Sequence, residues 1–319
     1  MPTVPILNKP LIHHDQVIDR ARTISSSAGM VTVAVAAAEE DDALLALERC
    51  RQEGIANALL VGRPQRIHTA LDSAGIARDT FEIVPTETEE EAAATTARLA
   101  ADGRAQVVMK GFLKTGILLK TILRHEYGLR DSELVSHSAV LYIPRYGKLL
   151  NITDGGTVVS PDHEQKLTIL ANGMTVMRAV GITRPRVAVL APDNTAREDL
   201  PETIFAERIV RDARRRFGTS LNINGPMTLE SAVTYPIVNG TEMENEVAGR
   251  ADILLVHTLE EGNIIAKTLI QFGDAIFMGV IAGARVPISL VSRSDSMTNK
   301  MASIALAVCM VHSQKEERS

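Results

Sequence analysis

The sequence predicts an α/β fold built on doubly wound parallel sheets, and three observations support this class. Short apolar stretches rich in Val, Ile and Ala alternate with amphipathic stretches of helical period, which is the rhythm of βαβα proteins. The core has to be aliphatic, because 45% of the residues are hydrophobic while only 3% are aromatic and Trp is absent. Buried parallel sheets have this composition. The length of 319 residues fits one large domain or two ordinary ones.

The first half of the chain shows the alternation most regularly. After a polar-to-amphipathic lead-in, residues 1–29, an acidic and then alanine-rich helix is the clearest helical element, with its carboxylates near its N-terminus as the helix dipole favours. Buried strands are predicted at 30–37, 55–61, 81–84 and 105–110, with helices through 44–50, at 65–74 and at 86–101.

The second half starts near Val135 with two short strands that flank a turn at 145–147 and are expected to pair antiparallel. A long helix follows, for which Ser160 is a plausible N-cap and Pro161 the first helical residue. The predicted elements are strands 140–143 and 149–153, helix 162–180, strand 186–190, helix 200–217, a loop at 224–226, helix 228–233, strand 253–256, helix 262–271, strands 275–282 and 286–291, and helix 300–311.

The charge and the cysteine content exclude several classes of function. A net charge of −5 argues against a nucleic-acid or anionic-membrane surface, and the basic run 211–216 is interpreted as a solvated helix face. Cys50 and Cys309 are the only cysteines and have no metal-ligand spacing, so neither a metal site nor a disulfide framework is expected. With no signal peptide or membrane span in the sequence, a cytoplasmic location is expected.

Polar residues at the end of one predicted strand are the strongest functional signal. The apolar stretch 286–291 ends in Ser292-Arg293-Ser294-Asp295, and a helical stretch follows. A second junction, Glu261-Gly262-Asn263-Ile-Ile-Ala-Lys267, also carries a cation. Strand ends that lead into helix N-termini bind anions in α/β proteins. Two cations at two such junctions therefore suggest a phosphate site.

These blocks, with several weaker ones in the same chain order, resemble the phosphate acetyl/butyryltransferase (phosphotransacylase) family over roughly residues 30–310. The motifs Ser-Arg-Ser-Asp-Ser at 292–296 and Asp-x-Glu-Gln-Lys at 162–166 resemble the butyryl-type branch more closely than the acetyl-type branch. The other supporting blocks are Val247 to Leu255, Met109-Lys110-Gly111, Val135 to Val140, Thr153-Asp154-Gly155-Gly156 and Gly225-Pro226.

The resemblance implies reversible transfer of a short acyl group, acetyl to butyryl, between coenzyme A and inorganic phosphate. A thiolate attacks directly in a ternary complex, so coenzyme A is a substrate and no permanently bound cofactor is expected. The family resemblance also implies a homodimer. It further implies two doubly wound α/β/α domains with a cleft between them, as in isocitrate and isopropylmalate dehydrogenases. The expected first domain is 1–133 plus 292–319, and the second is 134–291.

Three residues are the catalytic candidates. Arg293 would grip two phosphate oxygens with its guanidinium fork, and Ser292 would donate a hydrogen bond to the reacting acyl or thiol group. Asp295 is the carboxylate nearest in sequence to Ser292 and Arg293, and it is the candidate base that takes the thiol proton. The structural alternatives are an ion pair between Arg293 and Asp295, and capping of the next helix by Ser292 or Asp295.

Two further groups of residues are substrate-binding candidates. Lys267 would add positive charge near the phosphate, and Gly262 and Asn263 belong to the same block; an exposed lysine and a capping asparagine are the alternatives. Thr115-Gly116 matches a hydroxyl-and-small-residue turn near the substrate phosphate, and Asp154 follows a strand, where a turn role alone would explain it.

Three departures from the family pattern leave alternatives open. Asn299 stands where acetyl-type enzymes have an aspartate that resembles the general base, Ala266 replaces a common tyrosine, with a larger acyl pocket as one consequence, and Asn224 replaces an aspartate. A non-catalytic coenzyme-A-binding paralogue is therefore one alternative. A metal- and nicotinamide-dependent dehydrogenase on a related fold is another, although no Gly-x-Gly-x-x-Gly loop is present.

Overall fold

The structure, a computed structural model, describes residues 4, 7, 9–234, 237–238, 241–242, 245–292 and 295–318. The chain forms two compact units. The first consists mainly of His14–Glu133 and Met278–Ser319, and the second mainly of Leu134–Phe277. The domain limits that the family resemblance implies stay a prediction.

The first unit has a mixed sheet with strand order β3-β2-β1-β4-β13-β12. Its neighbours pair in parallel, except that β13 runs antiparallel to β12. The strands are β1 (Val31–Ala36), β2 (Ala56–Gly62), β3 (Glu82–Pro85), β4 (Val107–Lys110), β12 (Ile276–Ala282, of which the first two residues belong to the second unit) and β13 (Ile288–Ser289).

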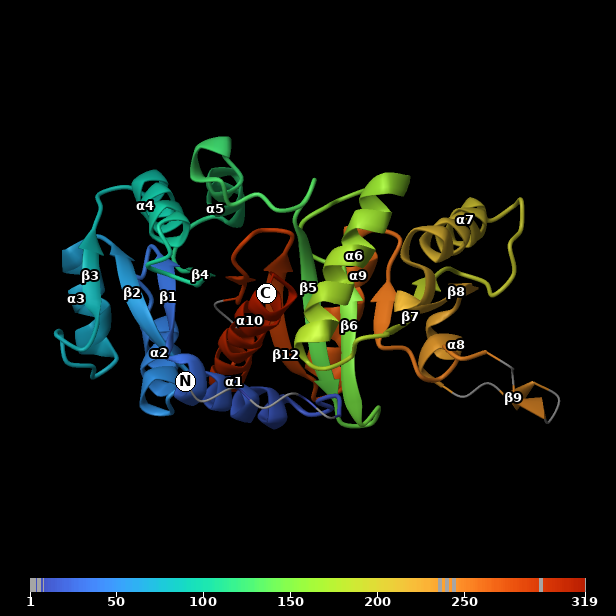
Figure 1. Ribbon diagram of the computed structural model, residues 1–319, viewed down its shortest axis with the longest axis horizontal. Helices are drawn as coiled ribbons and strands as arrows, with labels where there is room; N and C mark the ends of the chain where they lie inside the picture. The colour runs from blue at the N-terminus through green and yellow to red at the C-terminus, as the bar shows by residue number, and fades with distance from the viewer. Residues whose placement is uncertain are drawn as a thin grey trace. The chain divides into compact units, whose positions relative to one another are not determined.

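The chain of the first unit winds from β1 outward to β3 and then returns past β1 to β4. Right-handed crossovers in opposite directions place their helices on opposite faces of a sheet. Accordingly, α2 packs against α10, which in turn packs against α1, whereas α4 packs on β1 and β2 and against α5 (Figure 1). The helices are α1 (His14–Ala28), α2 (Asp41–Gln52), α3 (Pro64–Ser73), α4 (Glu89–Ala101), α5 (Thr115–Ile122), the 3₁₀ turn His125–Tyr127 and α10 (Met297–Arg318).

The second unit has the strand order β5-β6-β11-β7-β8. The pair β5–β6 is antiparallel, as the sequence predicts, and the other pairs are parallel. Its elements are β5 (Ser136–Ile143), β6 (Lys148–Thr153), α6 (His163–Ala179), β7 (Arg186–Leu190), α7 (Pro201–Phe217), the 3₁₀ turn Gly218–Ser220, β8 (Asn222–Met227), α8 (Leu229–Val233), the hairpin β9 (Ile237–Val238) with β10 (Thr241–Glu242), β11 (Ile253–Leu255) and α9 (Leu259–Phe272).

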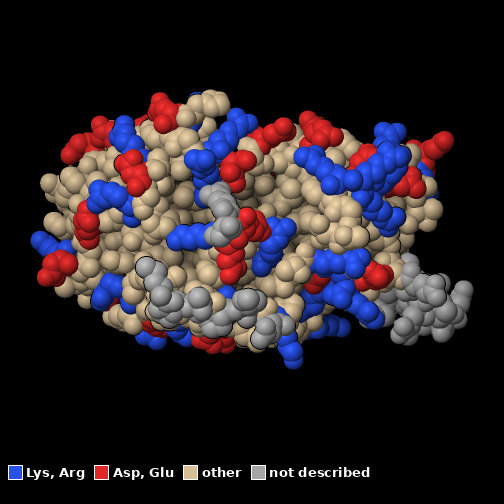
Figure 2. Space-filling model, viewed as in Figure 1, with Lys and Arg blue, Asp and Glu red and all other residues tan. Residues whose placement is uncertain are grey.

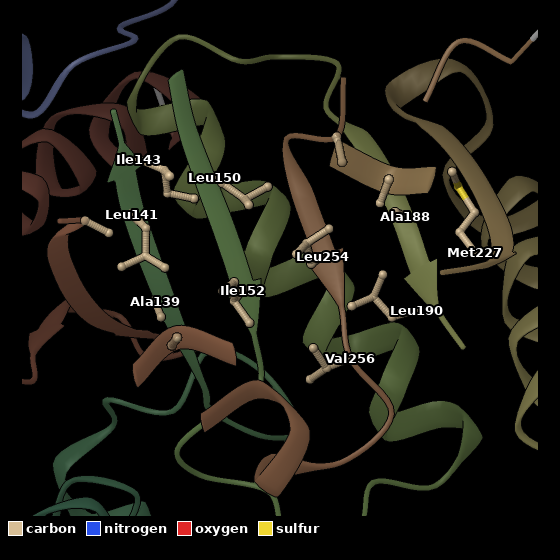
Figure 3. Packing of buried hydrophobic residues seen from close by; sticks show 14 of the residues in the cluster. Ala139, Leu141, Ile143, Leu150, Ile152, Ala188, Leu190, Met227, Leu254 and Val256 are labelled. Carbon is tan, nitrogen blue, oxygen red and sulfur yellow. The ribbon is translucent and has the colours of Figure 1, made fainter. Parts of the chain in front are cut away.

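Alternate residues of these strands form an aliphatic core on one face of the second sheet. Ala139, Leu141 and Ile143 of β5 point to the same side as Leu150 and Ile152 of β6 (Figure 3). Helix α9 covers this side through Ala266 and its neighbours, while α6 packs on the other side, where Gly173 lies against β6. Position 266 thus belongs to the core, and its small side chain faces other core residues.

Three local predictions are wrong. Asp162, and not Ser160, caps α6, because its carboxylate accepts the backbone N–H of Gln165 in a reciprocal capping box. Helix α9 begins at Leu259 behind the cap Thr258, three residues before the predicted start at 262, so Gly262 and Asn263 lie inside the helix and Asn263 does not cap it. Residues 224–226 belong to strand β8, although Gly225-Pro226 is typical of a loop.

Residues 14–28 of the lead-in form helix α1, and residues 115–116, expected in a turn, lie in the first turn of α5. Strand β13 is shorter than the predicted 286–291, and α10 is much longer than the predicted 300–311. In both cases the predicted boundary follows the aliphatic run, whereas the actual strand or helix begins and ends at other residues.

The basic run 211–216 lies on α7, where Figure 2 shows Lys and Arg side chains gathered. These arginines form ion pairs with neighbouring carboxylates: Arg211 and Arg215 with Asp212, and Arg216 with Glu164. The cluster is therefore a locally neutralised, solvated helix face, as the sequence analysis interprets it.

The carboxyl ends of β1 and β4 approach so closely that one position between them requires glycine. A Cβ added to Gly111 would lie 2.3 Å from the carbonyl oxygen of Ala37 and 2.7 Å from that of Ala36. We expect Gly111→Ala to lower the free energy of unfolding by about 2 kcal/mol or more, because backbone atoms have to move apart. Urea denaturation measures this change.

Gly116→Ala is the matched control for this substitution. No heavy atom lies within 4 Å of its added Cβ, and it sits in the first turn of α5. Alanine favours a helix over glycine, so this variant should be as stable as the parent or more stable. Equal urea-denaturation midpoints for Gly111→Ala and Gly116→Ala would contradict the close approach of the backbone at residue 111.

Candidate functional site

In the first unit, two groups of candidate residues lie at the same edge of the sheet. Strands β4 and β13 are parallel neighbours, with Ile288 opposite Val108. The chain leaves β4 toward Thr115 and Gly116, and leaves β13 toward Ser292. Both groups therefore follow carboxyl ends of adjacent strands, which is where open α/β sheets bind ligands. Thr115 is half-buried at the start of α5, and Ser292 is exposed.

Asp295 holds the turn that leads into α10. Its carboxylate oxygen Oδ2 accepts the backbone N–H of Ser292 at 2.6 Å, and its carbonyl oxygen accepts Lys300 Nζ at 2.6 Å. Ser296 caps α10, because its hydroxyl accepts the N–H of Asn299 at 3.2 Å, so capping does not fall to Ser292 or Asp295. The buried Asp295 carboxylate thus ties the backbone of Ser292 to the residues that precede α10. Arg293 and Ser294 lie outside the described residues.

In the second unit, Asp154 anchors the loop that follows β6. Its Oδ1 atom accepts the N–H groups of Gly156 and Thr157 at 2.7 and 2.9 Å, and Oδ2 accepts that of Val158 at 3.1 Å. The side chain is almost entirely buried, with 2% exposed. This is the turn role that the sequence analysis gives as the alternative. A substrate contact of Asp154 stays a prediction.

The loop after β6 and the start of α9 touch through bare backbone. A Cβ on Gly262 would lie 2.9 Å from the Cα atom of Gly155, and one on Gly155 would lie 2.9 Å from the carbonyl carbon of Gly262. Asn263 closes this contact, because its Nδ2 atom donates to the carbonyl oxygen of Gly155 at 3.3 Å. Asp154, Gly262 and Asn263 are thus brought together, at the carboxyl edge of the parallel pair β6–β11.

Lys267 lies one turn further along α9 than Asn263 and is exposed. Its Nζ atom is 5.9 Å from the centre of the Phe277 ring, a distance that permits a weak cation–π contact. An exposed ammonium that is held over a ring is available to an anion. Its proposed contact with phosphate stays a prediction.

Lys166 of α6, the last residue of the block 162–166, is not among the predicted site residues. Its side chain is buried, with 2% exposed, and its ammonium donates to the carbonyl oxygens of Val256 and His257 at 2.7 and 2.9 Å. Burial lowers the pKa of Lys166 to about 8, while the negative charges of Glu261 and Asp154 oppose this fall. Lys166 and Gly173 lie on the same side of α6, the side that packs on the sheet. This spacing is the sequence signal that could have identified Lys166 as buried.

Carboxylates and hydroxyls also fix the turn from β11 into α9. The N–H of His257 donates to Glu261 Oε2 at 2.6 Å, and the hydroxyl of Thr258 accepts the N–H of Glu261 at 3.3 Å. Lys166 reaches the same turn from α6. The carboxyl edge of the second sheet is therefore held by interactions from three elements: α6, β6 and α9.

Comparison with known proteins assigns the chain to a family. Residues 91–308 match the family model described as phosphate acetyl/butaryl transferase. The chain is 37% identical over 278 residues to a probable phosphate butyryltransferase of Bacillus subtilis, covering 87% of this chain and 92% of that protein. It is 34% identical, with the same coverage, to a phosphate butyryltransferase of Clostridium acetobutylicum. The chain belongs to this family, as the resemblance indicates.

Solved structures agree with the fold. A branched-chain phosphotransacylase from Enterococcus faecalis superimposes with a TM-score of 0.77 at 26% identity, covering 89% of this chain and 99% of that one. A 4-hydroxythreonine-4-phosphate dehydrogenase from Klebsiella pneumoniae gives 0.57 at 14% identity, covering 88% and 99%. The second likeness concerns the fold alone and matches the dehydrogenase-like architecture expected from the sequence. Among the described residues, no helix combines the length and hydropathy needed to cross a bilayer.

The lowered pKa of Lys166 makes stability depend on pH in a defined window. Unfolded Lys166 keeps its ordinary pKa of 10.5, whereas the folded residue releases its proton near pH 8. Between these values the unfolded chain binds more protons, so stability rises with pH. We expect the parent to gain up to ~3 kcal/mol relative to Lys166→Met from pH 8 to 10.5.

Urea unfolding of both proteins across this range measures the difference. Methionine keeps the length of the side chain and does not titrate, so all other lysines and tyrosines cancel in the comparison. A difference in unfolding free energy that stays constant from pH 8 to 10.5 would show that folding does not lower the pKa of Lys166.

Proposed function

We propose that this protein catalyses reversible transfer of a short acyl group between coenzyme A and inorganic phosphate. The observation that carries the proposal is the likeness to two phosphate butyryltransferases along 92% of their length. The groups at the carboxyl edge within each unit support it: the hydroxyl and N–H groups at the start of α5 in the first unit, and Asn263 and Lys267 of α9 in the second, since an acyl phosphate needs such groups around its anionic end.

In the direction that consumes acyl phosphate, the thiolate of coenzyme A attacks the carbonyl carbon. A C–S bond forms, and the C–O bond to phosphorus breaks as the tetrahedral adduct collapses. The phosphate leaves with that electron pair, and the thiol proton passes to a base. In the opposite direction a phosphate oxygen attacks the thioester, and coenzyme A leaves as the thiolate.

Four of the candidate residues have a proposed part in these steps. Arg293 and Lys267 would hold the phosphate oxygens, and Ser292 would donate to the reacting acyl or thiol group. Thr115, with its hydroxyl at the first position of α5, would bind phosphate alongside the N-terminal N–H groups of that helix. The base is the least defined part, because the Asp295 carboxylate already accepts the N–H of Ser292.

The acyl group is expected to be short, from acetyl to butyryl, with the butyryl-type relatives favouring the longer end. We also propose that the protein works as a homodimer in the cytoplasm, with coenzyme A as substrate and no permanently bound cofactor. Size-exclusion chromatography with light scattering tests the assembly. A panel of acyl-CoA lengths assayed with phosphate tests the acyl preference.

Loss of thioester absorbance tests the activity itself. Purified protein with butyryl-CoA should show loss that depends on added phosphate or arsenate. Stabilisation by coenzyme A, and none by NAD with magnesium, would separate this activity from that of a dehydrogenase in a thermal-shift assay. Absence of turnover with every short acyl-CoA, while a known phosphotransacylase works in the same buffer, would overturn the proposal.

Arg293→Ala should lower kcat/KM at least about a hundredfold, because each charged hydrogen bond contributes ~1.5–3 kcal/mol and a guanidinium makes two. Steady-state kinetics with varied phosphate measures the loss. Arg285→Ala is the matched control, since Arg285 is exposed and precedes β13 instead of following it. Coenzyme A binding without turnover, unchanged by Arg293→Ala, would instead identify a non-catalytic paralogue.

A further inference from the structure

Lys166 is a buried cation for which the chemistry of acyl transfer has no direct use. Its side chain is only 2% exposed, and its ammonium is occupied by the carbonyl oxygens of Val256 and His257. A thiol has no access to such an amine, so Lys166 is not the missing base. A lysine that is taken out of water also lowers stability unless its surroundings compensate. Its presence therefore needs another explanation.

The two carbonyls that Lys166 binds belong to the turn that starts α9. Val256 continues β11, where its N–H donates to the carbonyl oxygen of Thr153 at 3.1 Å, and His257 directly precedes the cap Thr258. The ammonium thus fixes the point at which the chain leaves the sheet. The direction of α9, and with it the place of Asn263 and Lys267, depends on this point.

The negative charges that favour the protonated form of Lys166 come from the residues that hold the neighbouring loops. Asp154 binds the N–H groups of residues 156–158, and Glu261 binds the N–H of His257. These two carboxylates are the charged groups that act on Lys166, from the end of β6 and from α9 respectively. His257, whose carbonyl it binds, has its ring against that of Phe205 on α7.

We propose that Lys166 is a positioning residue for phosphate binding: its buried ammonium fixes the turn from β11 into α9, and so holds Asn263 and Lys267 in place. This inference rests on the proposed acyl transfer. It adds a residue that acts through others and touches neither substrate. Charge is the property that matters, because charge-assisted hydrogen bonds are about twice as strong as neutral ones.

The chain offers a matched control at the opposite edge of the same strands. Lys148 begins β6, is also largely buried, and donates to the carbonyl oxygen of Arg250 at 2.9 Å. It forms an ion pair with Asp252, which precedes β11. Burial lowers its pKa as well, with Asp252 opposing the fall. Lys148 and Lys166 are therefore both buried or part-buried ammonium groups that bind backbone carbonyls next to β11, but at opposite edges, and Lys148 has an ion pair in addition.

Kinetics in the direction that consumes acyl-CoA tests the proposal, because no free thiol titrates as a substrate there. We expect Lys166→Met to raise KM for phosphate about tenfold, equivalent to ~1.4 kcal/mol, with a much smaller change in kcat. Lys148→Met should lower the thermal midpoint and leave KM unchanged. The parent should lose kcat/KM above about pH 8, as Lys166 deprotonates, and Lys166→Met should lack this loss.

Lys166→Arg keeps the test decisive if the methionine variant does not fold. Arginine stays protonated at all these pH values, so this variant should retain phosphate binding at pH 7 and show no loss above pH 8. The proposal is wrong if Lys166→Met matches Lys148→Met in KM, or if Lys166→Arg loses activity above pH 8 as the parent does. A parent that turns over no acyl-CoA would refute the proposed function instead.

Discussion

The contact between Gly155 and Gly262 is the constraint on which the candidate site of the second unit depends. With hydrogen atoms in place of side chains, the loop after β6 and the first turn of α9 come within van der Waals distance through their backbones. Any larger residue would separate them, and Asn263 would lose its bond to the carbonyl of Gly155. The two glycines thus determine how the strand-end loops of β6 and β11 share one edge.

Hydrogen bonds that carboxylates accept from backbone N–H groups occur at both candidate edges. Asp154 binds three consecutive N–H groups of its loop, and Asp295 binds the N–H of Ser292. A carboxylate that accepts several N–H groups fixes a loop more tightly than apolar contacts do, because each bond is directional. Loops built in this way keep their shape while they remain at the surface, where a substrate can reach them.

The sequence predicts most elements of the fold because their signals are local. The βαβα rhythm of the first unit and the antiparallel pair β5–β6 follow from strand and turn residues that neighbour one another in the chain. The cap of α6 is missed because Ser160, Pro161 and Asp162 all favour a helix start, and the reciprocal bond with Gln165 decides between them. Strand β8 is missed because pairing with β7 overrides the loop preference of Gly225-Pro226.

The site is predicted in part, for a related reason. The chain order places Asp154, Gly262 and Asn263 at strand ends, and strand pairing brings them together. What Asp154 and Asp295 bind depends on the local path of the backbone, which residue types do not specify. Lys166 is missed because a lysine near a helix N-terminus is ordinarily solvated. Only the packing of α6 against the sheet turns it inward.

Lys148 and Lys166 show that burial of a lysine has different consequences at the two edges of one sheet. Lys148 has a carboxylate in direct contact, so much of its desolvation is compensated by Asp252. The contacts of Lys166 are carbonyl oxygens, and its carboxylates act from further away. An ammonium held by dipoles alone is less stable when buried than one in an ion pair. The second sheet therefore carries its less favourable lysine at the carboxyl edge of its strands, where the candidate site lies.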